Sequence, residues 1–241
     1  AKSMALRYRH VEEGKWHQMR VRQHDVDKNR KRHQGLVGFP SSHDILPSNL
    51  DAYMEVLGKL LRANNEVLIV SKPRLDCIQP ICDACQFFRD RVLFRFTIGA
   101  MEDKVLSFWE TNAPKYSERK ACLEHAFNRG FRTSVSIEPM LDASNIEALV
   151  QDLMPLVSED IWLGTMNHLG RLKKDADDGL LKEIEIIEAG QRPEMLTAIS
   201  KAFENEPRVK WKSEALKVIT EHLKDLKGSG KPGGSTPAGL R

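Results

Sequence analysis

Residues 67–98, VLIVSKPRLDCIQPICDACQFFRDRVLFRFTI, contain one full unit of a pattern that recurs along this chain. The unit opens on the continuous apolar run of residues 67–70, which Lys72 and Pro73 break. Apolar residues then fall at helical spacing, and the unit closes on a second β-rich run at residues 92–98. Short apolar strands that alternate with helices are typical of a parallel sheet covered by helices. The sequence therefore predicts an α/β fold.

The same pattern continues on both sides of this stretch. It predicts strands at residues 36–39, 133–137, 161–164 and 209–211, and helices at residues 47–61, 117–129, 146–154, 177–203 and 213–226. Pro193 either kinks the helix at 177–203 or opens a second one. Parallel neighbours require right-handed crossovers, so the chain forms either an open doubly wound sheet or a barrel. Both architectures bind ligands where the strands end.

The composition is that of a globular protein in a reducing compartment. The chain has 241 residues, of which 41% are apolar and 29% charged, enough for one sizeable core. It has no stretch near the roughly 18 apolar residues that a membrane helix needs. Its four cysteines lack the even spread of a secreted disulfide framework. We therefore expect a cytoplasmic protein with reduced thiols and no membrane partner.

The two ends of the chain differ from its middle. Residues 2–33 hold ten Lys or Arg and four His against four acidic residues, although the net charge of the whole chain is only +3. Such a segment attracts phosphate backbones, but a solvated helical surface is its commoner explanation. Residues 228–239 are rich in Gly, Ser and Pro, which predicts a disordered tail. The chain begins at Ala1, without an initiator methionine, and enters a helix-like segment at residues 2–9, as expected of a fragment.

Polar side chains follow the predicted strands directly. A loop has no need of a Lys or Glu beside the last core residue, so together they predict a polar site at the carboxyl edge of the sheet. Taken singly, Lys72 is also explained as a solvated loop lysine, and Asp44 with Ser48 as a helix cap. The residues concerned are 41–44, Ser71, Lys72, Thr97, Glu138 and 165–168.

Several of these segments occur in an order that resembles a known family. They are Ser41-Ser42-His43-Asp44-Ile45-Leu46-Pro47, Ser71-Lys72, Arg95-Phe96-Thr97-Ile98, the run from Glu110-Thr111-Asn112-Ala113-Pro114 to Arg119, Gly130-Phe131, and Val135-Ser136-Ile137-Glu138-Pro139-Met140-Leu141. In order and spacing they resemble the radical S-adenosylmethionine superfamily, most closely its spore photoproduct lyase and DNA repair photolyase branch. The resemblance covers about residues 1–169. The turn at residues 42–44 departs from the common form of the family, which makes a distinct substrate plausible.

The resemblance implies a fold and a division of the chain. The expected fold is a partial parallel (β/α) barrel of the radical S-adenosylmethionine type, with its first strand missing and a helical extension at the carboxyl end. Residues 1–169 would form the partial barrel, 170–226 its continuation or a helical extension, and 227–241 a disordered tail. The defining Cys-x-x-x-Cys-x-x-Cys motif of the family follows the first strand. Residues 1–5 resemble the sequence just downstream of that motif, so the cysteines are expected before Ala1.

The resemblance also implies a chemistry. In the family, three thiolates hold a 4Fe–4S cluster whose free iron chelates S-adenosylmethionine. Electron transfer then cleaves the sulfonium, and the resulting radical abstracts hydrogen from the substrate. An electron donor such as a flavodoxin or ferredoxin is the implied partner, and a lyase-like outcome on an unknown substrate is the implied reaction. Without the cysteine ligands, this fragment alone is expected to be inactive.

The resemblance also implies which residues of this chain contact each part of the cofactor. Lys72 and Arg119 are the candidates for the cofactor carboxylate, since a cation beside an anion in a partly dry pocket gains a charge-assisted hydrogen bond. Asp44 is the candidate for its amino group. The remaining candidates are Ser42 and Thr97, for the ribose or methionine portion, and Glu138 and Asn167, for substrate or adenine.

Two of these assignments have structural alternatives. Instead of contacting the cofactor, Arg119 could pair with Glu110 and fix a loop. Instead of contacting substrate or adenine, Glu138 could satisfy the backbone hydrogen-bonding groups of a buried turn.

Three cysteines form the group Cys77-x4-Cys82-x2-Cys85, which is one residue longer in its first spacing than the family motif. They lie in a predicted helix among apolar residues, where cysteine serves as a small core residue. No metal ligands are therefore expected in this fragment, and a separate metal site at these three residues is the weaker alternative.

A different class of function is also open. The runner-up is a non-catalytic, nucleic-acid-binding α/β protein that uses the basic segment 2–33. Its affinity would fall steeply with salt, whereas binding of a small sulfonium cofactor in a pocket would change much less. A phosphate-binding metabolic barrel is disfavoured, because no Gly-rich loop opens a helix.

Overall fold

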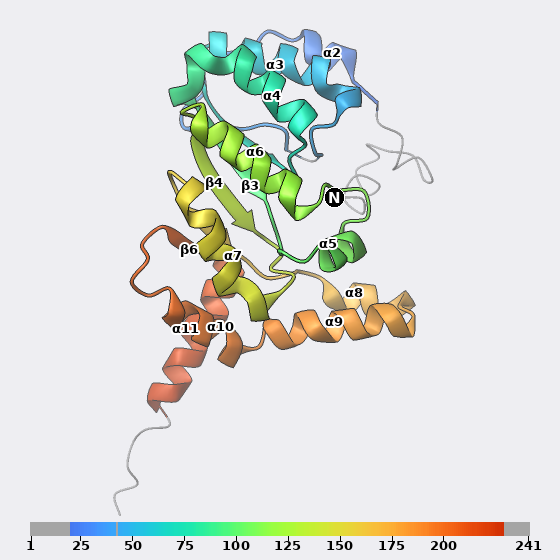
Figure 1. The fold of residues 1–241 in the computed structure, drawn as a ribbon, viewed down its shortest axis with the longest axis vertical. Helices are drawn as coiled ribbons and strands as arrows, with labels where there is room; N and C mark the ends of the chain where they lie inside the picture. Colours follow the sequence, from blue (N-terminus) through green and yellow to red (C-terminus); the bar gives the residue numbers. More distant parts are fainter. Residues whose placement is uncertain (1–19, 42, 229–241) are drawn as a thin grey trace, which may run out of the picture.

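The computed structural model describes residues 20–41 and 43–228, and its central feature is a six-stranded sheet (Figure 1). Every neighbouring pair of strands is parallel, and the strands lie in the order of the sequence. A doubly wound sheet reverses its strand order part-way, so this order excludes that alternative. The α/β fold with a parallel sheet is confirmed. The strands are β1 (Leu36–Gly38), β2 (Glu66–Ser71), β3 (Val92–Thr97), β4 (Arg132–Ile137), β5 (Ile161–Leu163) and β6 (Val209–Trp211).

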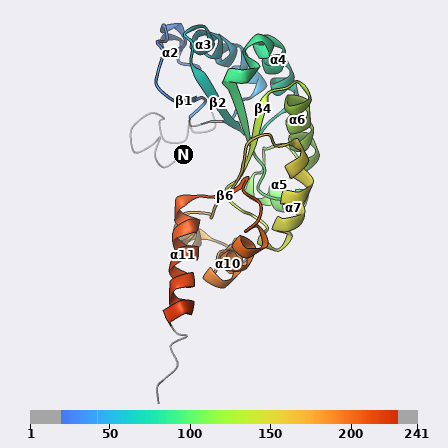
Figure 2. The same cartoon turned by 90° about the vertical axis from the view of Figure 1, so that its left-hand side faces the viewer.

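Helices cover one face of this sheet. Figure 2 shows α3, α4, α6 and α7 side by side along that face, as repeated right-handed crossovers require. The helices are α2 (Gln23–Asp27), α3 (Leu50–Arg62), α4 (Leu75–Cys85), α5 (Asp103–Trp109), α6 (Tyr116–Asn128), α7 (Ile146–Leu153), α8 (Leu169–Leu172), α9 (Asp178–Gly190), α10 (Pro193–Ala202) and α11 (Ser213–Gly228). Short 3-10 segments lie at η1 (Pro47–Asn49), η2 (Gln86–Arg91), η3 (Ala143–Asn145), η4 (Met154–Leu156) and η5 (Lys173–Asp175).

The main core lies between the sheet and these helices. Phe94 and Phe96 project from β3 into it and are fully buried. The Phe94 ring lies 5.3 Å from the ring of Phe96 and 5.3 Å from that of Phe131, between centroids. Edge and tilted contacts of this kind are the favoured arrangement of aromatic rings, and they add to the gain from burying apolar area.

The opposite face of the sheet carries a group of polar side chains on β3, β4 and β5. Successive side chains of a strand point to opposite faces, so Arg95 and Thr97 lie on the face that Phe94 and Phe96 avoid. In the pairing register Arg95 lies opposite Ser134 of β4, and Ser136 of β4 opposite Trp162 of β5. We call the face that carries Arg95, Thr97, Ser134, Ser136 and Trp162 the inner face. Parallel sheets usually have two apolar faces, so this group of polar side chains is unusual for such a sheet.

Most of the predicted elements are present, and the differences have physical causes. Pro193 opens the second helix, α10, because proline has no N–H to donate and is accommodated in the first turn. Helix α5 was not predicted, since it has seven residues with Leu106 as its buried one, too few for a helical period. Strand β6 pairs with β5, so the sheet continues beyond residue 170. The predicted disordered tail at 227–241 begins too early, because Lys227 and Gly228 belong to α11. The rest of that tail and the predicted helical start at 2–9 lie outside the described residues.

None of the described helices combines the length and the apolar character that crossing a membrane requires.

Candidate binding site at the carboxyl edge of the sheet

The parallel strands bring most of the predicted site residues to one edge. In Figure 1 the strands run from the end occupied by α2 and α3 toward the end where α5 and α9 lie. Asp44 lies in the connection after β1, Lys72 directly follows β2, and Thr97 ends β3. Glu138 directly follows β4, and Asn167 lies in the loop after β5. Ser42, also a predicted site residue, lies outside the described residues.

Asp44 is held in place by the end of β2. Its Oδ1 accepts hydrogen bonds from the backbone N–H of Lys72, at 2.8 Å, and from the Ser71 hydroxyl, at 3.3 Å. The Ser71 hydroxyl oxygen in turn accepts from the backbone N–H of Ile45, at 3.1 Å. The carboxylate is therefore oriented by two neighbouring chain segments and needs no ligand to fix it.

Lys72 lies between two carboxylates. Its Nζ is 3.6 Å from Asp44 Oδ2 and 3.8 Å from Glu110 Oε1. Both distances exceed that of a hydrogen bond, so within the part of the chain that the structure describes the three N–H donors of Nζ have no close acceptor. The side chains of Lys72 and Asp44 are 28% and 37% exposed, which leaves this ion pair open to a ligand from solvent.

Glu110 is positioned by Arg119. Arg119 Nη2 lies 2.6 Å from Glu110 Oε2 in an ion pair that lacks regular hydrogen-bond geometry. The guanidinium also donates to two backbone carbonyls, that of Pro114 at 2.7 Å and that of Thr97 at 3.2 Å. Arg119 has no exposed side-chain surface and Glu110 only 9%. The pairing that fixes the loop is therefore present, and a direct contact of Arg119 with a cofactor would require it to leave this pair.

Glu138 belongs to a second cluster, with a partner that the sequence did not indicate. Its Oε2 lies 2.9 Å from Nζ of Lys212, the residue after β6. Gly164 permits this pair, because a Cβ at that position would lie 2.9 Å from Cγ of each side chain. Glu138 thus joins the ends of β4 and β6. Asn167 is exposed and has no hydrogen bond to the other described candidates.

The inner face carries a polar network that sequence reasoning missed. Arg95 donates from Nε to the Ser134 hydroxyl, at 2.8 Å, and from Nη2 to Asp160 Oδ1, at 3.0 Å. The same carboxylate oxygen accepts from Trp162 Nε1. The Trp162 ring centroid lies 5.3 Å from the Arg95 guanidinium carbon and 5.4 Å from Lys212 Nζ. The sequence signal that could have revealed this network is the arginine in the middle of a predicted strand. Burying a charged side chain there costs free energy unless the charge has a partner.

The three grouped cysteines do not form a metal site. Cys77 and Cys82 are five residues apart on α4, about 1.4 helical turns, so their side chains point to different sides. Cys77, Cys82, Cys85 and Cys122 are all buried free thiols. Among residues 20–41 and 43–228, no three His, Cys, Asp or Glu side chains form a group that could hold a metal ion. The alternative of a metal at Cys77, Cys82 and Cys85 is thus not supported by the described geometry.

The thiols are expected to be unreactive in the folded protein. Burial raises the pKa of Cys77, Cys82 and Cys122 to about 12 and that of Cys85 to about 11. The thiolate is the reactive form, so we expect labelling by a thiol reagent at pH 8 to be slow until denaturant is added. Mass spectrometry of protein treated with iodoacetamide, with and without urea, measures this. Rapid labelling of Cys82 without urea would contradict the burial of α4.

Comparison with known proteins gives two similarities. No family model matches the chain. Over 145 residues the chain is 27% identical to a protein named uncharacterized protein ORF301 of Acidianus two-tailed virus, and the match covers 59% of this chain and 48% of that protein. Among solved structures, Streptococcus suis SuiB bound to S-adenosylmethionine is similar at a TM-score of 0.46 and 9% identity, over 79% of this chain and 52% of SuiB. The chain thus spans about half the length of each protein it matches.

Proposed function

We propose that this chain is a radical S-adenosylmethionine-type enzyme domain that binds S-adenosylmethionine at the carboxyl edge of its sheet. The observation that carries the proposal is the pair of Lys72 and Asp44. The pair is held by the backbone, is partly exposed, and has unused hydrogen-bonding capacity on both partners. The order of sequence segments that resembles the superfamily, which includes the segments of Asp44 and Lys72, is a second support.

The chemistry of the pair matches the amino-acid end of the cofactor. That end is a zwitterion, with one carboxylate and one ammonium group a single carbon apart. Lys72 Nζ offers three N–H donors to the carboxylate, and Asp44 Oδ2, which accepts no hydrogen bond from the described residues, is available to the ammonium group. A charged donor and a charged acceptor 3.6 Å apart can bind both groups at once, and charge-assisted hydrogen bonds are the stronger kind.

Other residues have supporting roles in this proposal. Arg119 is a positioning residue, because it neutralises Glu110 and keeps that carboxylate beside Lys72. Thr97 and Ser42 are proposed to make polar contacts with the ribose or methionine portion. Glu138 and Asn167 are proposed for adenine or substrate, as they follow the later strands.

The 4Fe–4S cluster of the proposal does not fit the described residues, which hold no suitable group of ligands. Its cysteines would have to come from outside residues 20–41 and 43–228. Such a cluster, when bound, supplies the electron that cleaves the sulfonium bond. In this proposal the described side chains bind and orient the cofactor. A lyase-like outcome and an electron donor such as a flavodoxin or ferredoxin belong to this proposal as well.

Calorimetric titration of the chain with S-adenosylmethionine tests the proposal without requiring a cluster. We expect Lys72→Ala to weaken binding at least about tenfold, as expected for the loss of a charge-assisted contact worth roughly 1.5–3 kcal/mol. Lys115→Ala removes another lysine near the same edge, one that is exposed and outside the Lys72 cluster, and should leave binding unchanged. Absence of binding by the unmodified chain, or equal affinity of the Lys72→Ala variant, would overturn the assignment.

A further inference from the structure

Positive side chains gather at the opposite edge of the sheet, where the strands begin. Lys31 and Arg32 precede β1, Arg62 precedes β2, and Arg89 and Arg91 precede β3. Because β1, β2 and β3 are parallel neighbours, these residues lie at the same edge. We call these five residues the basic edge.

Hydrogen bonds connect the three segments that carry the basic edge. The Asn65 amide donates to the Lys31 carbonyl, at 3.1 Å, and its oxygen accepts from the backbone N–H of His33, at 2.7 Å. Asn64, next to it in the turn before β2, accepts through Oδ1 from Arg91 Nη1. The segment before β1, the turn before β2 and the segment before β3 are thus joined into one surface.

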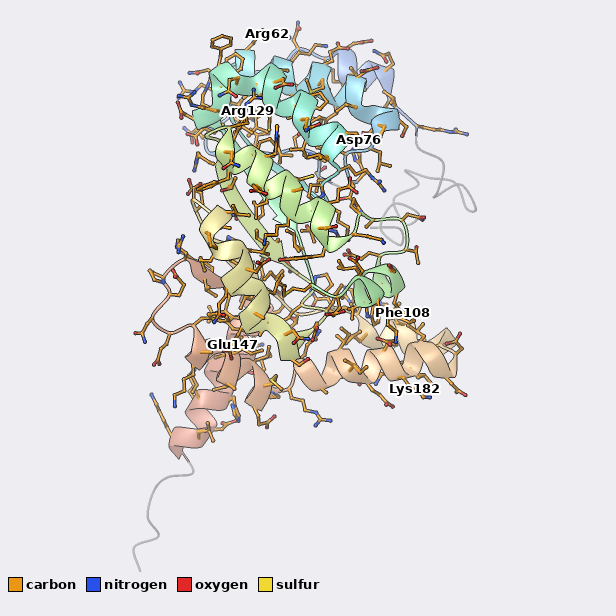
Figure 3. All side chains as sticks on the ribbon, viewed as in Figure 1. Arg62, Asp76, Phe108, Arg129, Glu147 and Lys182 are labelled. Atoms are coloured by element: carbon orange, nitrogen blue, oxygen red, sulfur yellow. The ribbon has the colours of Figure 1, made fainter. Side chains whose placement is uncertain are left out.

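The carboxylates that the structure describes do not neutralise the charge of the basic edge. No described carboxylate lies within ion-pair distance of any of its five residues, and four of them are exposed while Arg91 is half-buried. The neighbouring arginines differ, since Arg129 pairs with Asp83 at 2.7 Å, and Arg132 pairs with Glu66 at 3.1 Å and with Glu159 at 2.8 Å. Figure 3 shows Arg62 and Arg129 at the same end of the molecule.

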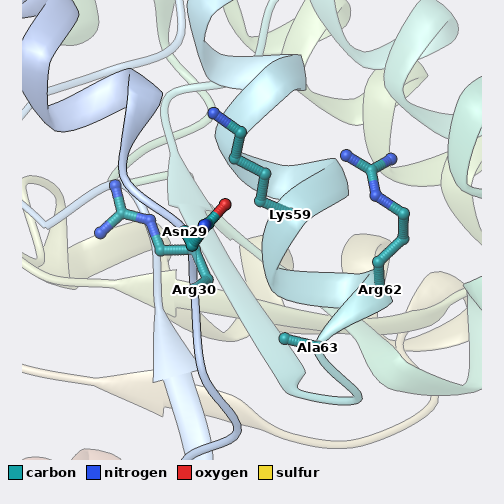
Figure 4. Close-up of a pocket in the computed structure, with 5 residues that line it drawn as sticks. All are labelled: Asn29, Arg30, Lys59, Arg62 and Ala63. Carbon is teal, nitrogen blue, oxygen red and sulfur yellow. The ribbon is translucent and has the colours of Figure 1, made fainter.

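A pocket of about 370 Å³ adjoins the basic edge and is itself cationic. Figure 4 shows Arg30, Lys59 and Arg62 around it, with Asn29 and Ala63. Lys59 is engaged, since its Nζ donates to Glu55 at 2.7 Å and to the Val26 carbonyl at 2.6 Å. Arg30 Nε is buried without a hydrogen-bond partner in the described structure. Cations in the last turn of α3 stabilise that helix. Arg30 lies outside it and donates from Nη2 to the Asp25 carbonyl, at 2.5 Å, so the pocket contributes positive charge beside the basic edge.

An aromatic side chain stands out from the same edge. Phe87 is 98% exposed, in the 3-10 segment η2 that also carries Arg89 and Arg91. Its neighbour Phe88 is half-buried, and the Arg91 guanidinium carbon lies 4.9 Å from the Phe88 ring centroid. Single exposed apolar side chains are common on protein surfaces, but this one lies in the same short segment as Arg89 and Arg91, where its ring is available for stacking beside positive charge.

We propose that the basic edge binds single-stranded nucleic acid, with phosphates on its five cations and one base stacked on Phe87. Unpaired cations along a surface with an exposed aromatic ring are the combination that such strands require. A base has a π face that stacks on the ring, which a free phosphate lacks. Exposed Asp90 lies between Arg89 and Arg91 and limits the net charge without reversing it. The surface is at the other end of the strands from Lys72, so this proposal does not depend on cofactor binding.

Fluorescence anisotropy with labelled oligo(dT), oligo(U) and a DNA duplex, each about 15 nucleotides long per strand, tests this on the whole chain. We expect both single strands to bind more tightly than the duplex, with affinity falling at least about tenfold between roughly 50 and 200 mM salt. The dT and U strands distinguish DNA from RNA as the source of the strand. Phe87→Ala should weaken single-strand binding about tenfold, and circular dichroism should show that the variant is folded.

Two double variants that each lose two positive charges distinguish binding at the basic edge from general electrostatic attraction between the protein and nucleic acid. Arg32→Ala with Arg89→Ala removes two positive charges from the basic edge and should reduce the salt slope by about 2. Lys104→Ala with Lys182→Ala removes two exposed charges elsewhere; Figure 3 shows Lys182 on α9, far from Arg62, and binding should be unchanged. No binding at low salt, equal losses in both double variants, or full affinity of Phe87→Ala would overturn the proposal.

Discussion

Replacing Arg119 with methionine is expected to lower the free energy of unfolding by about 3–5 kcal/mol, because it leaves a carboxylate uncompensated in a buried site. Glu110 is 9% exposed and has its ion pair with Arg119 at 2.6 Å. Lys72 lies 3.8 Å away and is already shared with Asp44. The substitution also removes two hydrogen bonds to the carbonyls of Thr97 and Pro114. Urea unfolding at neutral pH measures the loss.

Two further variants identify the cause of that loss. Glu110→Gln combined with Arg119→Met removes both charges and should recover a substantial part of the stability, since coupled neighbours are not additive. Arg171→Met changes an exposed arginine and should shift stability by no more than about 0.5 kcal/mol. A loss below about 1 kcal/mol for Arg119→Met would mean that water reaches Glu110.

Phe94→Ala is expected to cost about 3–5 kcal/mol, the range for removing a large buried aromatic side chain. Phe94 is fully buried on β3, the strand between β2 and β4, and its ring contacts those of Phe96 and Phe131. Removing it leaves a cavity between the sheet and the helices and ends both ring contacts. The shift of the urea midpoint measures this.

The matched control is Phe87→Ala, which removes the same atoms from a side chain that is 98% exposed. Its effect on stability should stay within about 0.5 kcal/mol. Comparable losses from the two variants would contradict the assignment of Phe94 to the core.

Local sequence patterns predicted most of the described elements. The strands are three to six residues long and lie at the predicted β-rich runs, and helices with a regular apolar period, such as α3 and α7, lie close to where they were expected. Helix α5 was missed because its seven residues show only one buried position. The parallel sheet was predicted, but the choice between a doubly wound and a singly wound order depends on which strands pair, which no local pattern contains.

The candidate site was predicted in part. Asp44 and Lys72 were identified because polar residues directly after strands must meet at one edge of a parallel sheet. Arg119 was identified only through the segment that resembles the family, and Glu110 only as its possible partner in fixing a loop. The partners Lys212 and Asp160 were not, because they lie far along the chain from Glu138 and Arg95. The cofactor roles of all these residues remain predictions.

The sequence by itself determined the α/β class, the positions of most strands and helices, and the polar character of the carboxyl edge. These follow from apolar periodicity and from residues next to one another in the chain. The tertiary structure decided which charges are paired. It buries Arg119 against Glu110, leaves Lys72 open, and places no described carboxylate within ion-pair distance of the cations of the basic edge. Such differences depend on distances of a few ångströms between segments remote in sequence, because electrostatic and hydrogen-bond energies change over that range.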